Sequence, residues 1–276
     1  MHIKTKNILT TLVVAGISAV AFPAKAATTF TAGDLLLGFR ATGGTGAASS
    51  LIVNIGDSIT IRDNDTSSAS LIDIGAALTS TYGSGWDTRT DLFWGVVGVR
   101  SNSAFDSPVS GDPARTLYMG RVNGADTIGA KSSSNLTTAT NTVHGTVANN
   151  VAGFQQAFDT YAGATLNGGL AAAIDTSVVN TWEDFTSGSS DFSVGTNIEG
   201  VIASEKVLDL YRILGDTTGA SPTGTLRTGA WQGTVSLSSA GVVSFDPVAI
   251  PEPSRVLFLG CGLGGLLMRR RRAVRA

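Results

Sequence analysis

Short apolar runs, separated by glycine- and serine-rich stretches, recur along the middle of the chain. Near residues 34–57, DLLLGFRA and SLIVNIGD are joined by a small-residue link and predict a β-hairpin. RTDLFWGVVGVRS, at 89–101, is the most strand-like run, and ARTLYMGRVNG at 114–124 is its expected partner. GAWQGTVSLSSAGVVSF, at 229–245, predicts a second hairpin. The pattern is typical of a mainly β protein.

Helical spacing is confined to shorter segments. Leu71, Ile74, Ala77 and Leu78 share one helical face and precede Gly83, which predicts a short helix that covers a sheet. The segment 151–166, VAGFQQAFDTYAGATL, is also expected to be helical.

Two further segments are less regular. SEKVLDLYRIL, at 204–214, fits both a helix and a strand, and we favour the strand. Residues 130–150 are rich in Ser, Thr and Asn and predict an exposed loop or an extended surface segment. The expected body is therefore one sandwich- or barrel-like domain with a few short helices, spanning residues 27–246. DPVAIPEP follows as a linker, since its prolines cannot donate hydrogen bonds to a sheet.

The N-terminus has the layout of a secretory signal. Lys4 and Lys6 precede an apolar run, and the triplet Ala24-Lys25-Ala26 resembles a cleavage site. We expect residues 1–26 to be removed after export through the Sec translocon. The alternative is an uncleaved membrane anchor, for which the apolar run is short.

The C-terminus combines an apolar segment with a basic cluster. Val256–Met268 contains thirteen apolar or glycine residues, short for a membrane helix. Arg269, Arg270, Arg271 and Arg272 follow it directly, and such a cluster disfavours translocation. The tail is therefore expected to act as a C-terminal membrane helix that stops in the inner membrane with its arginines in the cytoplasm.

Pro251, Glu252 and Pro253 stand immediately before this segment, so the tail resembles the PEP-CTERM sorting signal of exosortase substrates in Gram-negative bacteria. The resemblance implies that Pro251-Glu252-Pro253 is the recognition motif and that residues 247–276 form a transient anchor. An exosortase-type sorting enzyme would cut this anchor, after which the body reaches the cell surface or extracellular matrix. An ordinary single-pass anchor that is never processed is the alternative.

The body has a looser likeness to known sequences. FTAGDLLLGFRATGGTG, DLFWGVVG and LDLYRIL are similar to stretches of PEP-CTERM passengers from Verrucomicrobia-type genomes. Those passengers have no established activity, so this likeness implies no function for the body.

The overall net charge of −2 conceals an asymmetry between the body and its ends. Residues 27–250 contain ten basic and 20 acidic residues, a net charge of −10. Such a body is not expected to bind nucleic acid. The chain's single cysteine, Cys261, lies in the tail, so the body has no disulfide framework.

Candidate catalytic residues are scarce, and we expect no enzyme, no cofactor and no metal site. His144 is the one histidine that remains once His2 is removed, and it lies in a polar stretch typical of a surface position. The three body glutamates show no spacing that marks a glycosidase pair. Asp63-Asn64-Asp65 lacks the glycine and closing acid of a calcium loop and indicates an Asx-rich turn.

The sequence therefore predicts an exported structural or adhesive protein. The alternative is a carbohydrate-binding module for extracellular polysaccharide, in which exposed aromatic rings stack on sugars. Trp86, Asp87 and Arg89 are the candidate ligand-binding residues, because a turn at a helix end could expose the indole beside a carboxylate and a guanidinium.

Overall fold

The structure is a computed structural model of the full chain. It describes residues 30–63, 68–100, 111–122, 137–138, 141–161, 165–166, 170–187, 198–215 and 227–247. The predicted signal peptide, the Pro251-Glu252-Pro253 motif, the apolar segment 256–268 and Arg269–Arg272 lie outside these residues.

Within the described residues, one antiparallel sheet of eleven strands dominates the protein. Along the sheet the order is β3-β13-β12-β10-β5-β4-β1-β2-β8-β7, and β9 pairs with β4 beside this path. The strands are β1 (Asp34–Ala41), β2 (Ser49–Asp57), β3 (Ala69–Asp73), β4 (Leu92–Val99), β5 (Leu117–Val122), β7 (Thr165–Leu166), β8 (Ala171–Asp175), β9 (Gly200–Val201), β10 (Val207–Ile213), β12 (Ala230–Leu237) and β13 (Val242–Pro247). β6 (Thr137–Thr138) and β11 (Arg227–Thr228) form a separate pair.

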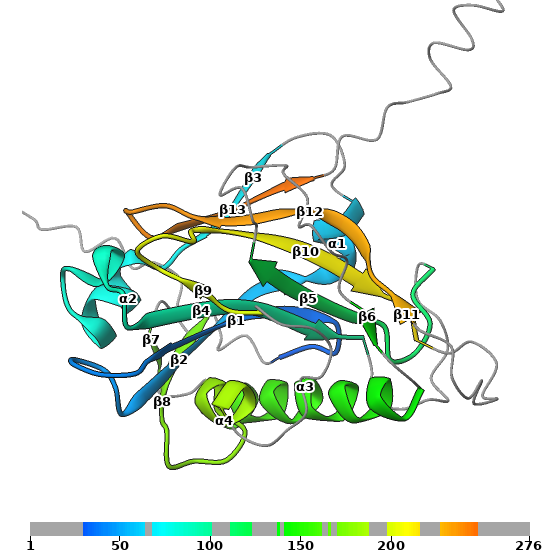
Figure 1. Cartoon of the computed structure of the whole chain (residues 1–276), viewed down its shortest axis with the longest axis horizontal. Coiled ribbons are helices and arrows are strands. Elements are labelled where there is room, and N and C mark those ends of the chain that lie inside the picture. Colours follow the sequence, from blue (N-terminus) through cyan, green and yellow to red (C-terminus); the bar gives the residue numbers. More distant parts are fainter. Residues whose placement is uncertain are drawn as a thin grey trace, which may run out of the picture.

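The sheet is curled, with the shape of half a barrel (Figure 1). Its concave face carries one apolar cluster, in which residues of β1, β2 and β4 meet residues of β12 and β13. The helices α1 (Ser58–Asp63) and α2 (Gly75–Tyr82) and the 3-10 turn η1 (Trp86–Thr88) contribute to the same cluster. The alternation along β1 places Leu35, Leu37 and Phe39 in this cluster.

The convex face carries a second apolar cluster, which includes Leu36 of β1. Two helices cover it, α3 (Asn141–Tyr161) and α4 (Trp182–Ser187), and Figure 1 shows both lying across the lower side of the sheet. Because both faces are buried, β1 and β4 are apolar along nearly their whole length rather than alternating with polar residues.

Most strand predictions are confirmed. β1 and β2 form the first hairpin, β5 pairs with β4, residues 207–213 form a strand, and β12 and β13 form the second hairpin. The mainly β class is confirmed, and the described body is dominated by one curled sheet with short helices on its concave face and the 21-residue α3 beside the short α4 on its convex face.

Four local predictions are wrong. Thr165 and Leu166, which we expected at the end of a helix, form the short strand β7, and that helix ends at Tyr161. Residues 69–73, which we expected in the short helix, form the edge strand β3, and the helix begins only at Gly75. Residues 141–150, expected in a loop, form the first half of α3, because Val147 extends the buried stripe of Val151, Phe154 and Phe158 by one turn. Pro247, which we placed in the linker, ends β13, beyond the last residue of β13 that pairs with β3.

Trp182 locks α4 onto the sheet at two facing glycines. Gly38 of β1 and Gly95 of β4 are opposite each other in the register, and the indole of Trp182 lies on both. A Cβ atom at either position would overlap with ring atoms of Trp182. The ring is fully buried and also packs on Phe154 and Phe185, with centroids 5.4 Å and 5.1 Å away. The absence of side chains at these two glycines therefore leaves the space that the Trp182 ring occupies.

We expect Gly38→Ala and Gly95→Ala each to lower the free energy of unfolding by about 1–3 kcal/mol, because the added methyl group displaces Trp182. Urea unfolding followed by tryptophan fluorescence measures this change. Gly85→Ala is the matched control, since a Cβ atom there meets no atom within 4 Å and its φ of −98° suits any residue. Equal stability of the three variants would contradict the role of the two glycines.

Candidate functional site

The expected exposure of Trp86 is wrong. η1 folds back onto the concave face, and only 3% of Trp86 is exposed, within the same cluster as Tyr82. Asp87 beside it is half-buried. A surface for stacking on a sugar ring is therefore not formed by this indole.

Arg89 holds together the segments around Trp86. Its guanidinium donates to the carbonyl oxygens of Gly43 and Thr45, both at 2.6 Å, and of Tyr82 at 3.0 Å. It also forms a two-point ion pair with Asp91, at 2.8 Å and 2.9 Å. The hydrogen bonds from Arg89 lower the pKa of the Asp91 carboxyl below its ordinary value. Arg89 thus joins the β1–β2 loop to the end of α2.

The other aromatic rings of the described body are also largely internal. Trp94 and Trp182 are fully buried, Trp231 is half-buried, and Tyr82 and Tyr118 are at most 2% exposed. Trp94 donates to the carbonyl of Glu205 at 2.7 Å, and Trp231 donates to Asp209 at 3.1 Å. These rings act as core residues with their polar atoms paired.

His144 is buried, and our prediction of a surface position is wrong. It lies in the first turns of α3, 3% exposed, with its Nε2 atom 2.6 Å from the carbonyl oxygen of Arg115. Arg115 has a positive φ of 60°, which is unusual for a residue with a side chain. The contact attaches α3 to the turn before β5.

Arg40 binds two glutamates that lie far from it in the sequence, Glu183 and Glu199. Arg40, at the end of β1, donates to both oxygens of Glu199, at 2.7 Å and 2.8 Å, and to Glu183 at 3.2 Å. The indole of Trp182 also donates to Glu199, at 2.7 Å. The sequence spacing gave no sign of this cluster, because α4 and β9 approach β1 only in the folded chain.

This polar cluster covers one end of the apolar cluster on the convex face. The Arg40 guanidinium lies 5.0 Å from the centre of the Phe93 ring, and its side chain is 14% exposed. The pKa of Arg40 is raised by its hydrogen bonds to Glu199. Since the Arg40 guanidinium binds both glutamates, it holds the two carboxylates in fixed positions.

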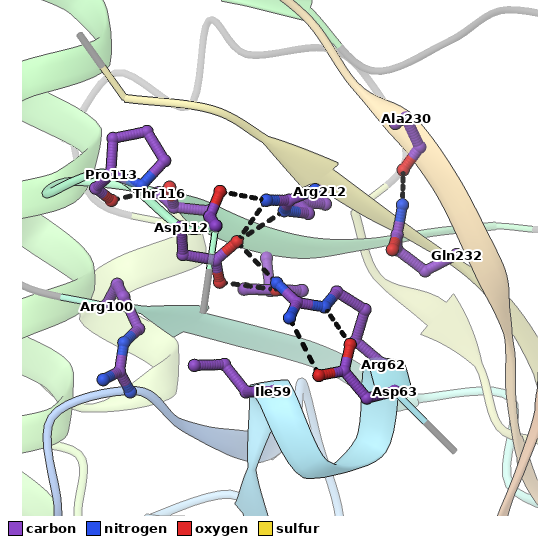
Figure 2. A network of polar contacts seen from close by, with 12 residues as sticks. Ile59, Arg62, Asp63, Arg100, Asp112, Pro113, Thr116, Arg212, Ala230 and Gln232 are labelled. Atoms are coloured by element: carbon purple, nitrogen blue, oxygen red, sulfur yellow. Dashed lines mark hydrogen bonds and ion pairs between the residues drawn. The ribbon is translucent and has the colours of Figure 1, made fainter. Parts of the chain in front are cut away.

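Asp112 carries one of the fully buried carboxyl groups of the described chain. Its side chain is fully buried, and Figure 2 shows it between Arg62 and Arg212. Oδ1 accepts from Arg62 Nη1 at 2.7 Å and from Arg212 Nε at 2.6 Å, and Oδ2 accepts from the Tyr118 hydroxyl at 2.7 Å. Arg62 comes from α1, Tyr118 from β5 and Arg212 from β10.

The same network extends to the surface through Asp63. Arg62 binds Asp63 through two hydrogen bonds, at 2.6 Å and 3.0 Å, which lower the pKa of Asp63. Burial, followed by the hydrogen bond to Asp112, raises the pKa of Tyr118, so its hydroxyl remains protonated and donates. Two arginines and two aspartates balance in charge, and the network cross-links α1, β5 and β10.

Possible metal ligands are scattered over the described part of the chain. There, no three His, Cys, Asp or Glu side chains are grouped so as to hold a metal ion. The Asp63 carboxylate is occupied by Arg62, and Asn64 and Asp65 lie outside the described residues. Among the helices described, none has the length and apolar character needed to cross a membrane.

Comparisons with known proteins identify no relative of this chain. No family model, no curated protein and no solved structure matches the chain.

We expect Asp112→Asn to lower the free energy of unfolding by about 3–5 kcal/mol, because it leaves two largely buried arginines without their shared anion. Urea unfolding gives the difference. Asp63→Asn is the control on the same network, and because 57% of the Asp63 side chain is exposed its cost should stay below about 1 kcal/mol. Similar losses in both variants would contradict the central position of Asp112.

We expect the Arg89–Asp91 ion pair to contribute to stability at neutral pH and to lose this contribution in acid. The folded-state pKa of Asp91 lies below its unfolded value, so the contribution is complete above about pH 4 and disappears as the pH falls through the folded-state pKa. Since 37% of the Asp91 side chain is exposed, the effect is below about 1 kcal/mol. Urea unfolding of the natural protein and of Asp91→Asn, at pH values above and below this pKa, measures the contribution. A stability difference between the two proteins that grew in acid would refute this expectation.

Proposed function

We propose that the chain is an exported structural or adhesive protein, sorted to the cell surface or extracellular matrix through its PEP-CTERM tail. The proposal is supported by the order of parts along the chain: a signal sequence over 1–26, a folded body, the Pro251-Glu252-Pro253 motif, an apolar segment and an arginine cluster. The Sec translocon, the inner membrane and an exosortase-type enzyme are the expected partners.

The observation that carries the proposal is the position of the folded body between these signals. Both apolar clusters are built from residues between Phe30 and Phe245. The last strand, β13, ends at Pro247, directly before the motif that begins at Pro251. Cuts after Ala26 and near the motif would therefore leave both described cores intact.

The distribution of charge supports a structural role for the body. The described arginines with ion pairs, which include Arg40, Arg62, Arg89 and Arg212, are at most 20% exposed in their side chains. The charged residues with largely exposed positions in the described body are aspartates: Asp63, Asp73, Asp175 and Asp184. Arginines thus serve as internal cross-links, and the acidic exterior keeps a released body soluble.

Intact mass spectrometry of the protein from the cell surface and medium of its native host tests the proposal. The expected mass starts near Ala27 and ends near Pro251-Glu252-Pro253. Glu252→Ala should retain the whole tail, because it removes the carboxylate of the motif, while Ser254→Ala, two residues away, should be processed normally. A natural protein that retains Arg269 to Ala276 in cells with an active sorting enzyme would show an unprocessed single-pass anchor instead.

A further inference from the structure

The described body contains two aspartate–proline peptide bonds in very different environments. They are Asp112–Pro113, in the turn before β5, and Asp246–Pro247, at the end of β13. An aspartate carboxylate can attack its own backbone carbonyl carbon, since the two groups belong to one residue and are held close together. Before a proline, the leaving nitrogen is that of a tertiary amide, which is more easily expelled once it is protonated.

At Asp112 the carboxylate is held in place by several hydrogen bonds. Both carboxylate oxygens are held, one by Arg62 and Arg212 and the other by Tyr118. Asp112 and Pro113 are both buried, so water has little access to the bond. Freeing the carboxylate would require the breaking of several charge-assisted hydrogen bonds in a buried site.

At Asp246 these constraints are weak. Asp246 and Pro247 are only half-buried, and within the described residues the Asp246 carboxylate accepts one hydrogen bond, from the Ser68 hydroxyl. The pairing of β13 with β3 ends at Phe245, so the bond lies beyond the part of β13 that has a partner on each side.

On the side of β12, this bond packs closely against the backbone of a glycine rather than against a side chain. Gly233 of β12 pairs with Pro247 and has a φ of 144°. A Cβ atom at Gly233 would overlap with the carbonyl oxygen of Asp246. The neighbouring strand thus presents no side chain against the carbonyl that would be attacked.

We propose that Asp246–Pro247 is a self-cleavage site at which the body separates from its tail in mildly acidic surroundings, without a sorting enzyme. An Asp246 carboxylate oxygen bonds to the carbonyl carbon of the same residue. The bond from this carbon to the Pro247 nitrogen breaks as the nitrogen takes a proton from solvent. One water molecule then opens the cyclic anhydride and leaves Asp246 with two carboxyl groups.

This inference is independent of the proposed sorting function. Its product ends at Asp246, whereas a sorting enzyme would produce an end near Pro251-Glu252-Pro253. The two routes therefore give different masses, and either can fail without the other.

The test uses purified full-length protein in detergent, kept at the lowest pH at which its near-UV circular dichroism is native. Intact mass spectrometry over time should show fragments 1–246 and 247–276, with cleavage at Asp246 more than about tenfold faster than at Asp112, where several hydrogen bonds hold the carboxylate. In about 6 M guanidinium chloride at the same pH, the two bonds should be cleaved at similar rates, because unfolding removes the difference in environment.

Two variants separate the proposed chemistry from contaminating protease activity. Asp246→Ala removes the nucleophile and should abolish cleavage at this bond. Ser68→Ala frees the carboxylate and should accelerate cleavage, by about two- to tenfold for one lost hydrogen bond. The proposal is overturned if the folded protein is not cleaved after Asp246, if Asp112–Pro113 is cleaved at least as fast, or if Asp246→Ala is still cleaved.

Discussion

The packing of Trp182 on the paired glycines of β1 and β4 is the contact on which the convex side of the protein depends. Without a side chain at Gly38 and Gly95, the indole reaches the sheet backbone, and Phe154 and Phe185 then pack around it. The indole nitrogen donates to Glu199, which in turn binds Arg40. One ring thereby determines where α3 and α4 lie and how the end of β1 is closed.

Arginine has a comparable role elsewhere in the body. Arg89 donates to three backbone carbonyls, two in the β1–β2 loop and one at the end of α2. Arg62 and Arg212 share a buried carboxylate that also binds Tyr118, which links a helix to two strands. A planar guanidinium with five donors suits such multi-partner positions better than an ammonium. In a body without disulfides, these contacts link segments that are distant in sequence.

The sequence was sufficient to predict the strands with strong local patterns, such as β1, β4 and the β12–β13 hairpin, because their apolar runs are bounded by turn residues. It was not sufficient for β3, whose apolar residues also fit a helix and whose partner lies at the far end of the chain. The exposure of Trp86 was predicted incorrectly, since the burial of a turn depends on where η1 folds back. The meeting of Asp112 with Arg62 and Arg212, 50 and 100 residues away, has no local signature.

The pairing of β3 with β13 sets the order in which the body can be completed. β3 is near the start of the folded region, yet its described strand partner is the last strand before the tail. A chain that emerges N-terminus first therefore holds β3 without its partner until the whole body has followed. Final closure of the sheet therefore has to wait until β13, the last described strand, has emerged, so that vectorial synthesis completes this fold only near the end of the chain.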